Sequence, residues 1–100
     1  MLDVTLKKNG TEGELVLVGR MDAVSSPGAE KLMLQTAERF DTLVLNMEKL
    51  EYISSAGLRA LKKARLAMKN KGGTLAVKNV TKPIMEVFEM TSFAPLLKFI

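Results

Sequence analysis

The first part of the chain has the apolar and polar pattern of two β-strands. Residues 4–8 and residues 14–20 are rich in leucine, valine and threonine, and the turn-prone Asn9-Gly10-Thr11-Glu12-Gly13 separates them. A five-residue connection with two glycines suits a hairpin. The two strands are therefore predicted to be antiparallel neighbours.

The spacing of apolar residues then changes to that of a helix. Ser26 is a suitable N-cap and Pro27 suits the first helical position, so a helix is expected to begin there. One face of this helix gathers the apolar and small residues Ala29, Leu32, Met33, Thr36, Ala37 and Phe40. Because its charged residues fall elsewhere, the pattern predicts an amphipathic helix that covers a sheet.

The rest of the chain continues the alternation of strands and helices. Residues 42–45 are apolar without alternation, as in an interior strand buried on both faces. A second helix follows Ser54-Ser55-Ala56-Gly57 and extends to about Asn70, where Lys71-Gly72-Gly73 ends it. Residues 74–78 predict another strand. A third helix, capped by Thr81, and a last strand over residues 96–100 complete the chain.

This order, β-β-α-β-α-β-α-β, indicates the fold class. Strands joined by helices favour parallel crossovers, so we expect an α/β fold with a mixed, mostly parallel sheet, an N-terminal antiparallel hairpin and a cover of amphipathic helices. One hundred residues suit one domain over residues 1–100, because two halves would each be too small to bury a core.

The composition removes many kinds of function. The chain has no cysteine and no histidine, which excludes thiolate chemistry, Ser-His-Asp triads and histidine-ligated metal sites. We therefore expect neither an enzyme nor a bound cofactor or metal. Neither a signal peptide nor the ~18 apolar residues of a membrane helix is apparent, so a cytoplasmic protein without membrane insertion is expected.

Charge is distributed unevenly along the chain. Residues 1–50 hold six Lys and Arg against eight Asp and Glu, whereas residues 51–100 hold nine against three. Eight basic residues and no acidic one lie between Arg59 and Lys82. This run suggests a surface that meets an anionic partner, or a solvated helix face. A nucleic-acid-binding module is the rival hypothesis, but five aromatic residues and the absence of a binding motif disfavour it.

The two serines before the second helix carry the most specific signal. One serine suffices to cap a helix, so the hydroxyl of the other is expected to face solvent. Free N–H groups and the positive end of the helix would favour a phosphate at this position.

Three segments of the chain resemble STAS domains, specifically the bacterial anti-sigma-factor antagonists. Residues 43–59, with Ser54-Ser55-Ala56-Gly57-Leu58, resemble the family's apolar strand followed by Asp-Ser-Ser/Ala-Gly-Leu. Residues 19–23 resemble its Gly-x-Leu-Asp element, and residues 88–97 resemble its closing helix and last strand. The resemblance covers nearly the whole chain in matching order.

The resemblance implies a partner switch, and its alternative within the same family is a STAS scaffold or transporter-complex subunit that does not switch. An unphosphorylated antagonist of this family binds an anti-sigma factor that is also a GHKL-type serine kinase, phosphorylation releases it, and a PP2C-type phosphatase restores it. The acceptor of the family falls on Ser55, whereas Ser54 replaces the usual aspartate and is the alternative acceptor. Asp22 matches an aspartate near the phosphosite, although a turn cap explains it equally. Gly57 indicates either close helix packing or close approach of the partner.

The face of the second helix adds candidate contact residues. At 100° per residue, Arg59, Lys62, Lys63, Lys69 and Asn70 share the arc opposite the predicted core face, and Leu66 lies in its middle. We hypothesise that Leu58 and Leu66 flank a docking surface that begins at Ser55. Arg59 and Lys62 would then meet carboxylates of the partner.

Overall fold

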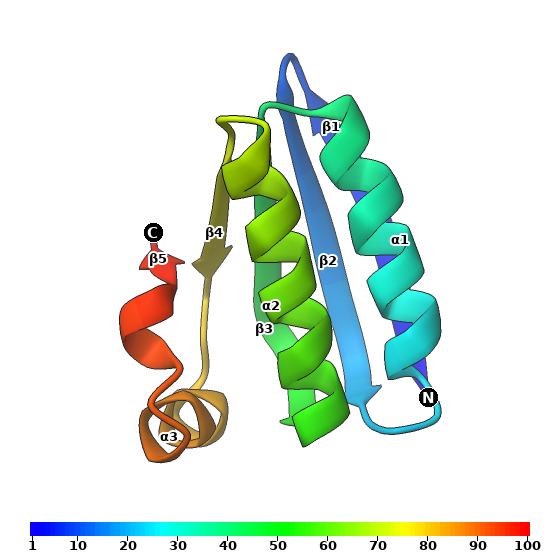
Figure 1. Cartoon of the computed structure of the whole chain (residues 1–100). Helices are drawn as coiled ribbons and strands as arrows, with labels where there is room; N and C mark the ends of the chain where they lie inside the picture. The colour runs from blue at the N-terminus through cyan, green and yellow to red at the C-terminus, as the bar shows by residue number, and fades with distance from the viewer.

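Five strands form one sheet in the computed structural model, which describes residues 1–100 (Figure 1). The strands are β1 (Leu2–Asn9), β2 (Glu12–Met21), β3 (Thr42–Ile53), β4 (Thr74–Lys78) and β5 (Lys98–Phe99), in the spatial order β1-β2-β3-β4-β5. β1 and β2 pair in antiparallel register and the other neighbours pair in parallel. The predicted α/β class, the N-terminal hairpin and the mostly parallel sheet are confirmed.

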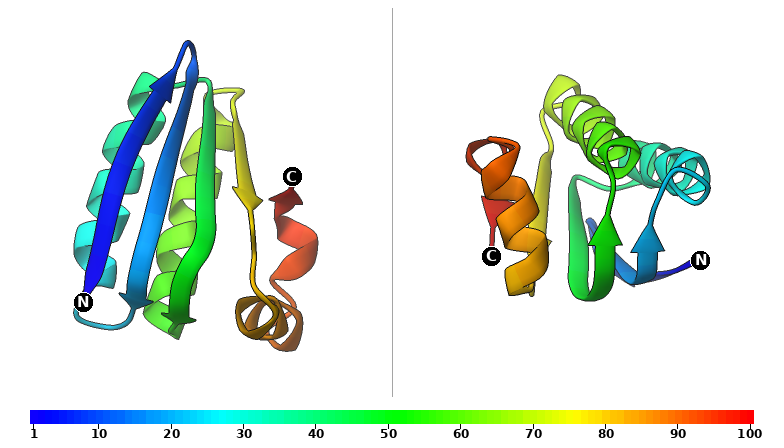
Figure 2. Two further views of the ribbon diagram at one scale, coloured as in Figure 1. Left: turned by 180° about the vertical axis from the view of Figure 1, so that it is seen from behind. Right: turned by 90° about the horizontal axis from the view of Figure 1, so that it is seen from below.

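Helices cover one side of this sheet. They are α1 (Ser26–Arg39), α2 (Ser55–Asn70) and α3 (Lys82–Met90), and a short 3-10 helix spans Ala94–Leu96. α1 and α2 lie side by side on the same face, α3 lies by the β4 edge, and the opposite face of β1, β2 and β3 carries no helix (Figure 2). No helix of the molecule has both the length and the apolar character needed to cross a bilayer.

The core lies between the sheet and the two long helices. On β2, Leu15 and Leu17 are fully buried, and Leu15 pairs in register with the buried Leu45 of β3. The helices close this layer with small side chains and methionines, among them Ala29, Met33, Ala37, Ala60, Leu61, Ala64 and Met68. The inner face expected for the first helix is therefore correct in its main members.

The hairpin strands are longer than expected, because β1 and β2 stay paired up to Asn9 and Glu12, so the connection is Gly10-Thr11 rather than the five residues 9–13. Three further boundaries differ from the sequence expectation. The strand placed at residues 42–45 extends to Ile53, because buried Met47, Leu50 and Ile53 continue its inner face beyond the first polar residues. The N-cap of α1 is Ser25 rather than Ser26, since the Ser26 N–H already donates to the Asp22 carbonyl at 2.9 Å. The last strand begins at Lys98, because the N–H groups of Leu96 and Leu97 belong to the 3-10 turn.

A polar network crosses the face of the sheet away from α1 and α2. Asn46 Nδ2 donates to one Glu14 carboxylate oxygen at 3.0 Å, and Lys78 Nζ lies 3.0 Å from the other. Hydrogen bonds from Asn46 and then from Lys78 hold the pKa of Glu14 below its ordinary value, since both favour the carboxylate over the acid. This network joins β2, β3 and β4 from outside the apolar core.

Candidate functional site

The beginning of α2 is joined to the end of β2. Met21 and Ile53 are paired in register where β2 and β3 end, and Ser54 follows as the N-cap of α2. The Ser54 N–H donates to the Met21 carbonyl at 2.9 Å, and Ser54 Oγ donates to the same oxygen at 3.1 Å. The two elements that present the candidate site therefore hold each other in place.

The two adjacent serines have different surroundings. Ser54 Oγ also accepts the Gly57 N–H at 3.2 Å, which caps the helix and leaves the side chain half-buried. Ser55 is the first residue of α2, is exposed, and its hydroxyl forms no hydrogen bond within the protein. The expectation that one serine caps the helix while the other faces solvent is confirmed.

Gly57 lies in the first turn of α2 and faces the interior. A Cβ atom there would lie 2.7 Å from Ile53 Cγ1 and 3.1 Å from the Met21 carbonyl oxygen. Because backbone cannot yield as a flexible side chain can, this position requires glycine for close packing of the helix on the strand ends. The packing explanation of Gly57 is thus sufficient, and a contact with a partner remains a prediction.

Asp22 shapes the loop from β2 to α1, next to the serines. Its Oδ1 accepts the N–H groups of Ser25 at 2.9 Å and Val24 at 3.0 Å, and Ser25 Oγ lies 3.1 Å away. The hydrogen bond from the Ser25 backbone, followed by those from the Ser25 hydroxyl and Val24, keeps the pKa of Asp22 below its ordinary value. The carboxylate therefore has a turn-forming role, and a role toward the phosphosite stays a prediction.

Val24 is a surface residue that the sequence analysis missed. It is 91% exposed at the tip of the β2–α1 loop, which lies at the same end of the molecule as the start of α2 (Figure 1). A single valine in a short loop has no periodicity that could reveal it. Its exposure makes it a candidate apolar contact point at the end of the molecule where α2 begins.

The residues that the helical phase places on the outer face of α2 are exposed as expected, and their contact with a partner remains a prediction. Arg59 and Lys62 are exposed, and Leu66 is 53% exposed. Leu58 is half-buried because it packs against the core cluster, so it exposes less of its side chain than Leu66 does. Ser55, Arg59, Lys62, Leu66 and Val24 together are called the switch surface below.

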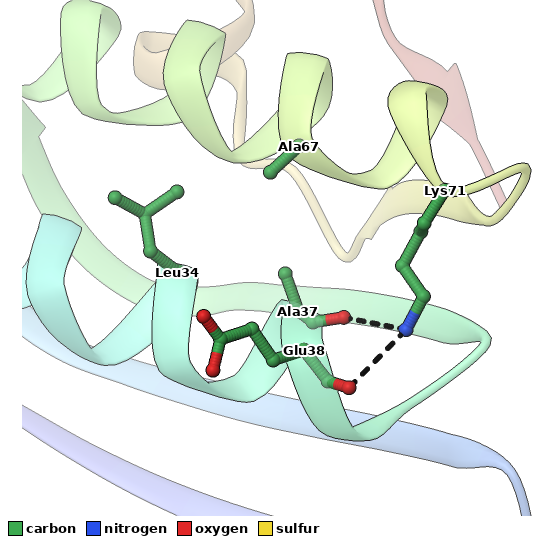
Figure 3. A pocket seen from close by; sticks show the side chains of 5 residues that line it. All are labelled: Leu34, Ala37, Glu38, Ala67 and Lys71. Carbon is green, nitrogen blue, oxygen red and sulfur yellow. Dashed lines mark hydrogen bonds between the residues drawn. The ribbon is translucent and has the colours of Figure 1, made fainter.

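A hollow of about 450 Å³ lies between α1 and α2 at their C-terminal ends, away from Ser55 (Figure 3). Lys71 Nζ donates to the carbonyls of Ala37 at 2.8 Å, Phe40 at 2.9 Å and Glu38 at 3.4 Å. A cation at these carbonyls completes the C-terminal end of α1. The ammonium group of Lys71 is thus already occupied by carbonyl groups of the protein.

Comparisons with known proteins agree with this geometry. The family model described as STAS domain matches residues 3–100. The anti-sigma-B factor antagonist of Bacillus subtilis (strain 168) is 22% identical over 96 residues, which cover 96% of this chain and 88% of that protein. BtrV of Bordetella bronchiseptica, provisionally named an anti-sigma factor antagonist, is 34% identical over 70% of this chain and 64% of its own length.

Solved structures match the fold. SpoIIAA, the anti-sigma factor antagonist, superposes in its unphosphorylated form with a TM-score of 0.77 at 14% identity, over 98% of this chain and 87% of that one. Its phosphorylated form, described as a Bacillus cell fate determinant, gives a TM-score of 0.77 at 15% identity, over 98% and 91%. The two forms of that protein therefore resemble this fold equally well.

Proposed function

Because the chain belongs to the STAS domain family, we propose that it is an anti-sigma-factor antagonist that switches partners through phosphorylation of Ser55. The observation that carries the proposal is that the two adjacent serines have different hydrogen bonding and exposure. Ser54 caps α2 with its hydroxyl, whereas the hydroxyl of Ser55 is exposed and free. The names of the two relatives support the same role.

The partners follow from this proposal. The unmodified chain binds an anti-sigma factor that is also a GHKL-type serine kinase, and a PP2C-type phosphatase returns the modified chain to its free form. In the kinase step, Ser55 Oγ forms a bond to the γ-phosphorus of ATP while the bond to the bridging oxygen breaks. ADP leaves, and a base of the kinase takes the hydroxyl proton. Binding, phosphorylation and dephosphorylation would all take place in the cytoplasm.

The switch surface explains how binding would occur. Arg59 and Lys62 offer positive charge and donors to partner carboxylates, while Val24 and Leu66 offer apolar contacts at its two ends. Interfaces commonly gain most of their affinity from a few such anchors surrounded by polar contacts. The basic run after Ser55 thereby serves an acidic protein surface.

Phosphorylation acts on the interface rather than on the fold. A phosphate adds about −1.5 to −2 charges at pH 7, and the N-terminal end of a helix tolerates negative charge. α2 therefore stays intact, and steric bulk and repulsion from an acidic partner surface weaken the complex.

The test is ATP-dependent phosphorylation by the cognate kinase, with the site mapped by mass spectrometry. We expect modification of Ser55, loss of modification in Ser55→Ala, and its retention in Ser54→Ala. Modification of Ser54, or none at all, contradicts the proposal. Equal partner binding by Ser55→Ala and Ser55→Asp would instead identify a STAS scaffold that does not switch, and salt-sensitive binding of nonspecific DNA would favour the nucleic-acid rival.

A further inference from the structure

A small hollow lies between the first turns of α1 and α2. Its volume is about 180 Å³, and it is lined by Ser26, Pro27, Glu30, Ala56, Arg59 and Lys63. Ala56 directly follows Ser55 in the chain. The hollow is therefore adjacent to the proposed phosphoacceptor.

The lining of the hollow is suited to an oxyanion. Ser26 is only 3% exposed, and its Oγ is the one buried side-chain polar atom of the protein without a hydrogen-bond partner. The positive ends of two long helices meet here, and both favour negative charge. The Ser26 N–H already donates to the Asp22 carbonyl and the Gly57 N–H to Ser54 Oγ, so the helix ends contribute chiefly through their dipoles. The unused hydroxyl is an observation independent of the helix ends, and it also indicates a missing acceptor.

The charges around the hollow leave one cation free. Lys63 lies 3.5 Å from the Glu30 carboxylate, whereas Arg59 forms no ion pair. Arg59 lies one helical turn after Ser55, and residues at i and i+4 of a helix are neighbours on one face. A guanidinium group also matches the geometry of phosphate oxygens.

We infer that the phosphoryl group on Ser55 is held by its own protein in this hollow, with Arg59 as its principal partner and Ser26 as a further donor. The inference rests on the proposed function. It adds a second effect to the switch, because the phosphate occupies the arginine that the unmodified chain offers to its partner. Release then comes from loss of a cation at the interface as well as from repulsion.

The test is a ³¹P NMR titration of the full chain with phosphoserine installed at position 55 during translation. The charged groups of the surrounding elements are Asp22 of the β2–α1 loop, Glu30 of α1, and Arg59, Lys62 and Lys63 of α2. A nearby cation favours the dianion, so the second phosphate pKa should lie about half a unit or more below its value in urea-unfolded protein.

Matched variants separate the arginine from general charge. Arg59→Gln should remove most of this shift, and Arg59→Lys should retain part of it. Ser26→Ala should reduce it by a smaller amount. Arg65→Gln removes the same charge from the same helix, but at a position about 15 Å along the helix axis from Ser55, and should leave the shift unchanged.

Equal phosphate pKa values in the wild type, Arg59→Gln and Arg65→Gln would overturn the inference, because the phosphate would then be free in solvent. This failure is distinct from failure of the proposed function. The phosphoserine is installed without a kinase, so the titration gives its answer whether or not a kinase modifies Ser55.

Discussion

The carbonyl oxygen of Met21 accepts both the N–H and the hydroxyl of Ser54, at 2.9 and 3.1 Å. This relationship fixes the start of α2 to the end of β2, two elements that are far apart in the sequence. Ser55 therefore projects from a rigid point, and the loop that carries Asp22 and Val24 begins beside it. A hydroxyl presented in this way suits recognition by another protein, because little has to be ordered on binding.

Replacement of the two serines should separate the structural serine from the free one. Ser54→Ala removes the N-cap bond to Gly57 and the bond to Met21, so the free energy of unfolding should fall by about 1–2 kcal/mol. Ser55→Ala, its matched control, should change it by no more than about 0.5 kcal/mol. Urea denaturation of both variants measures the difference, and equal losses would be inconsistent with the capping role of Ser54.

The glycine in the first turn of α2 should resist even the smallest substitution. Gly57→Ala places a methyl group 2.7 Å from Ile53 Cγ1 and 3.1 Å from the Met21 carbonyl oxygen, so stability should fall by about 1–3 kcal/mol. This loss would be opposite in sign to the usual effect, because alanine normally stabilises a helix relative to glycine by about 1 kcal/mol.

Gly28→Ala in the first turn of α1 is the control for this change, since a Cβ there meets nothing within 4 Å. It should be neutral or stabilising by up to about 1 kcal/mol. Thermal or urea denaturation compares the two variants. A stable Gly57→Ala protein would contradict the close packing of α2 on the strand ends.

The outer polar network should make stability depend on pH through Glu14. Because the folded pKa of Glu14 is lowered from 4.5, the carboxylate contributes stability above pH 4.5, and this contribution is lost as pH falls through the lower folded value. Glu14→Gln should therefore cost about 1 kcal/mol at pH 7 and progressively less in acid.

Denaturation curves of Glu14→Gln and wild type between pH 7 and pH 3 test this dependence. Glu48→Gln is the control, because Glu48 is exposed and its carboxylate forms neither an ion pair nor a hydrogen bond. A cost of Glu14→Gln that is constant over the whole range would show that the ionised carboxylate contributes nothing.

The apolar tip of the β2–α1 loop should matter for binding but not for folding. Val24→Asp places a charge at a 91% exposed position of the switch surface, so it should weaken binding to the cognate anti-sigma factor at least tenfold. Leu66→Asp and Lys62→Glu should weaken binding in the same direction.

The matched control for the loop is Met90→Asp, at the end of α3, where the side chain is 85% exposed. This variant should leave the affinity unchanged. Isothermal titration calorimetry gives the affinities and circular dichroism confirms the fold. Similar losses in Val24→Asp and Met90→Asp would place the docking surface elsewhere.

Most of the fold could be predicted from local patterns. Short apolar runs bounded by turn-prone residues predicted the strands, helical spacing predicted the long helices, and the order of these elements indicated the parallel crossovers. The long β3 was missed in part because Asn46, Glu48 and Lys49 interrupt its apolar run, and only pairing with β2, with its register shifts, reveals a continuous strand. The Ser26 cap was misplaced because the Asp22 turn lets the helix begin one residue earlier.

The candidate site was predictable in its residue types and less so in its contacts. A double serine before a helix indicates one cap and one free hydroxyl, and the structure shows which is which. The bond from Ser54 to Met21 joins residues 33 positions apart, and no local pattern contains it. The hollow beside Ala56 likewise depends on how α1 packs against α2.

The state of Ser55 should decide whether the partner binds, and a single set of affinity measurements can establish this. The cognate anti-sigma factor is titrated by calorimetry with the unmodified chain, with Ser55→Ala, and with the chain carrying phosphoserine at position 55. We expect similar affinities for the first two and at least a hundredfold weaker binding for the third. Equal affinity of the unmodified and phosphorylated chains would contradict it.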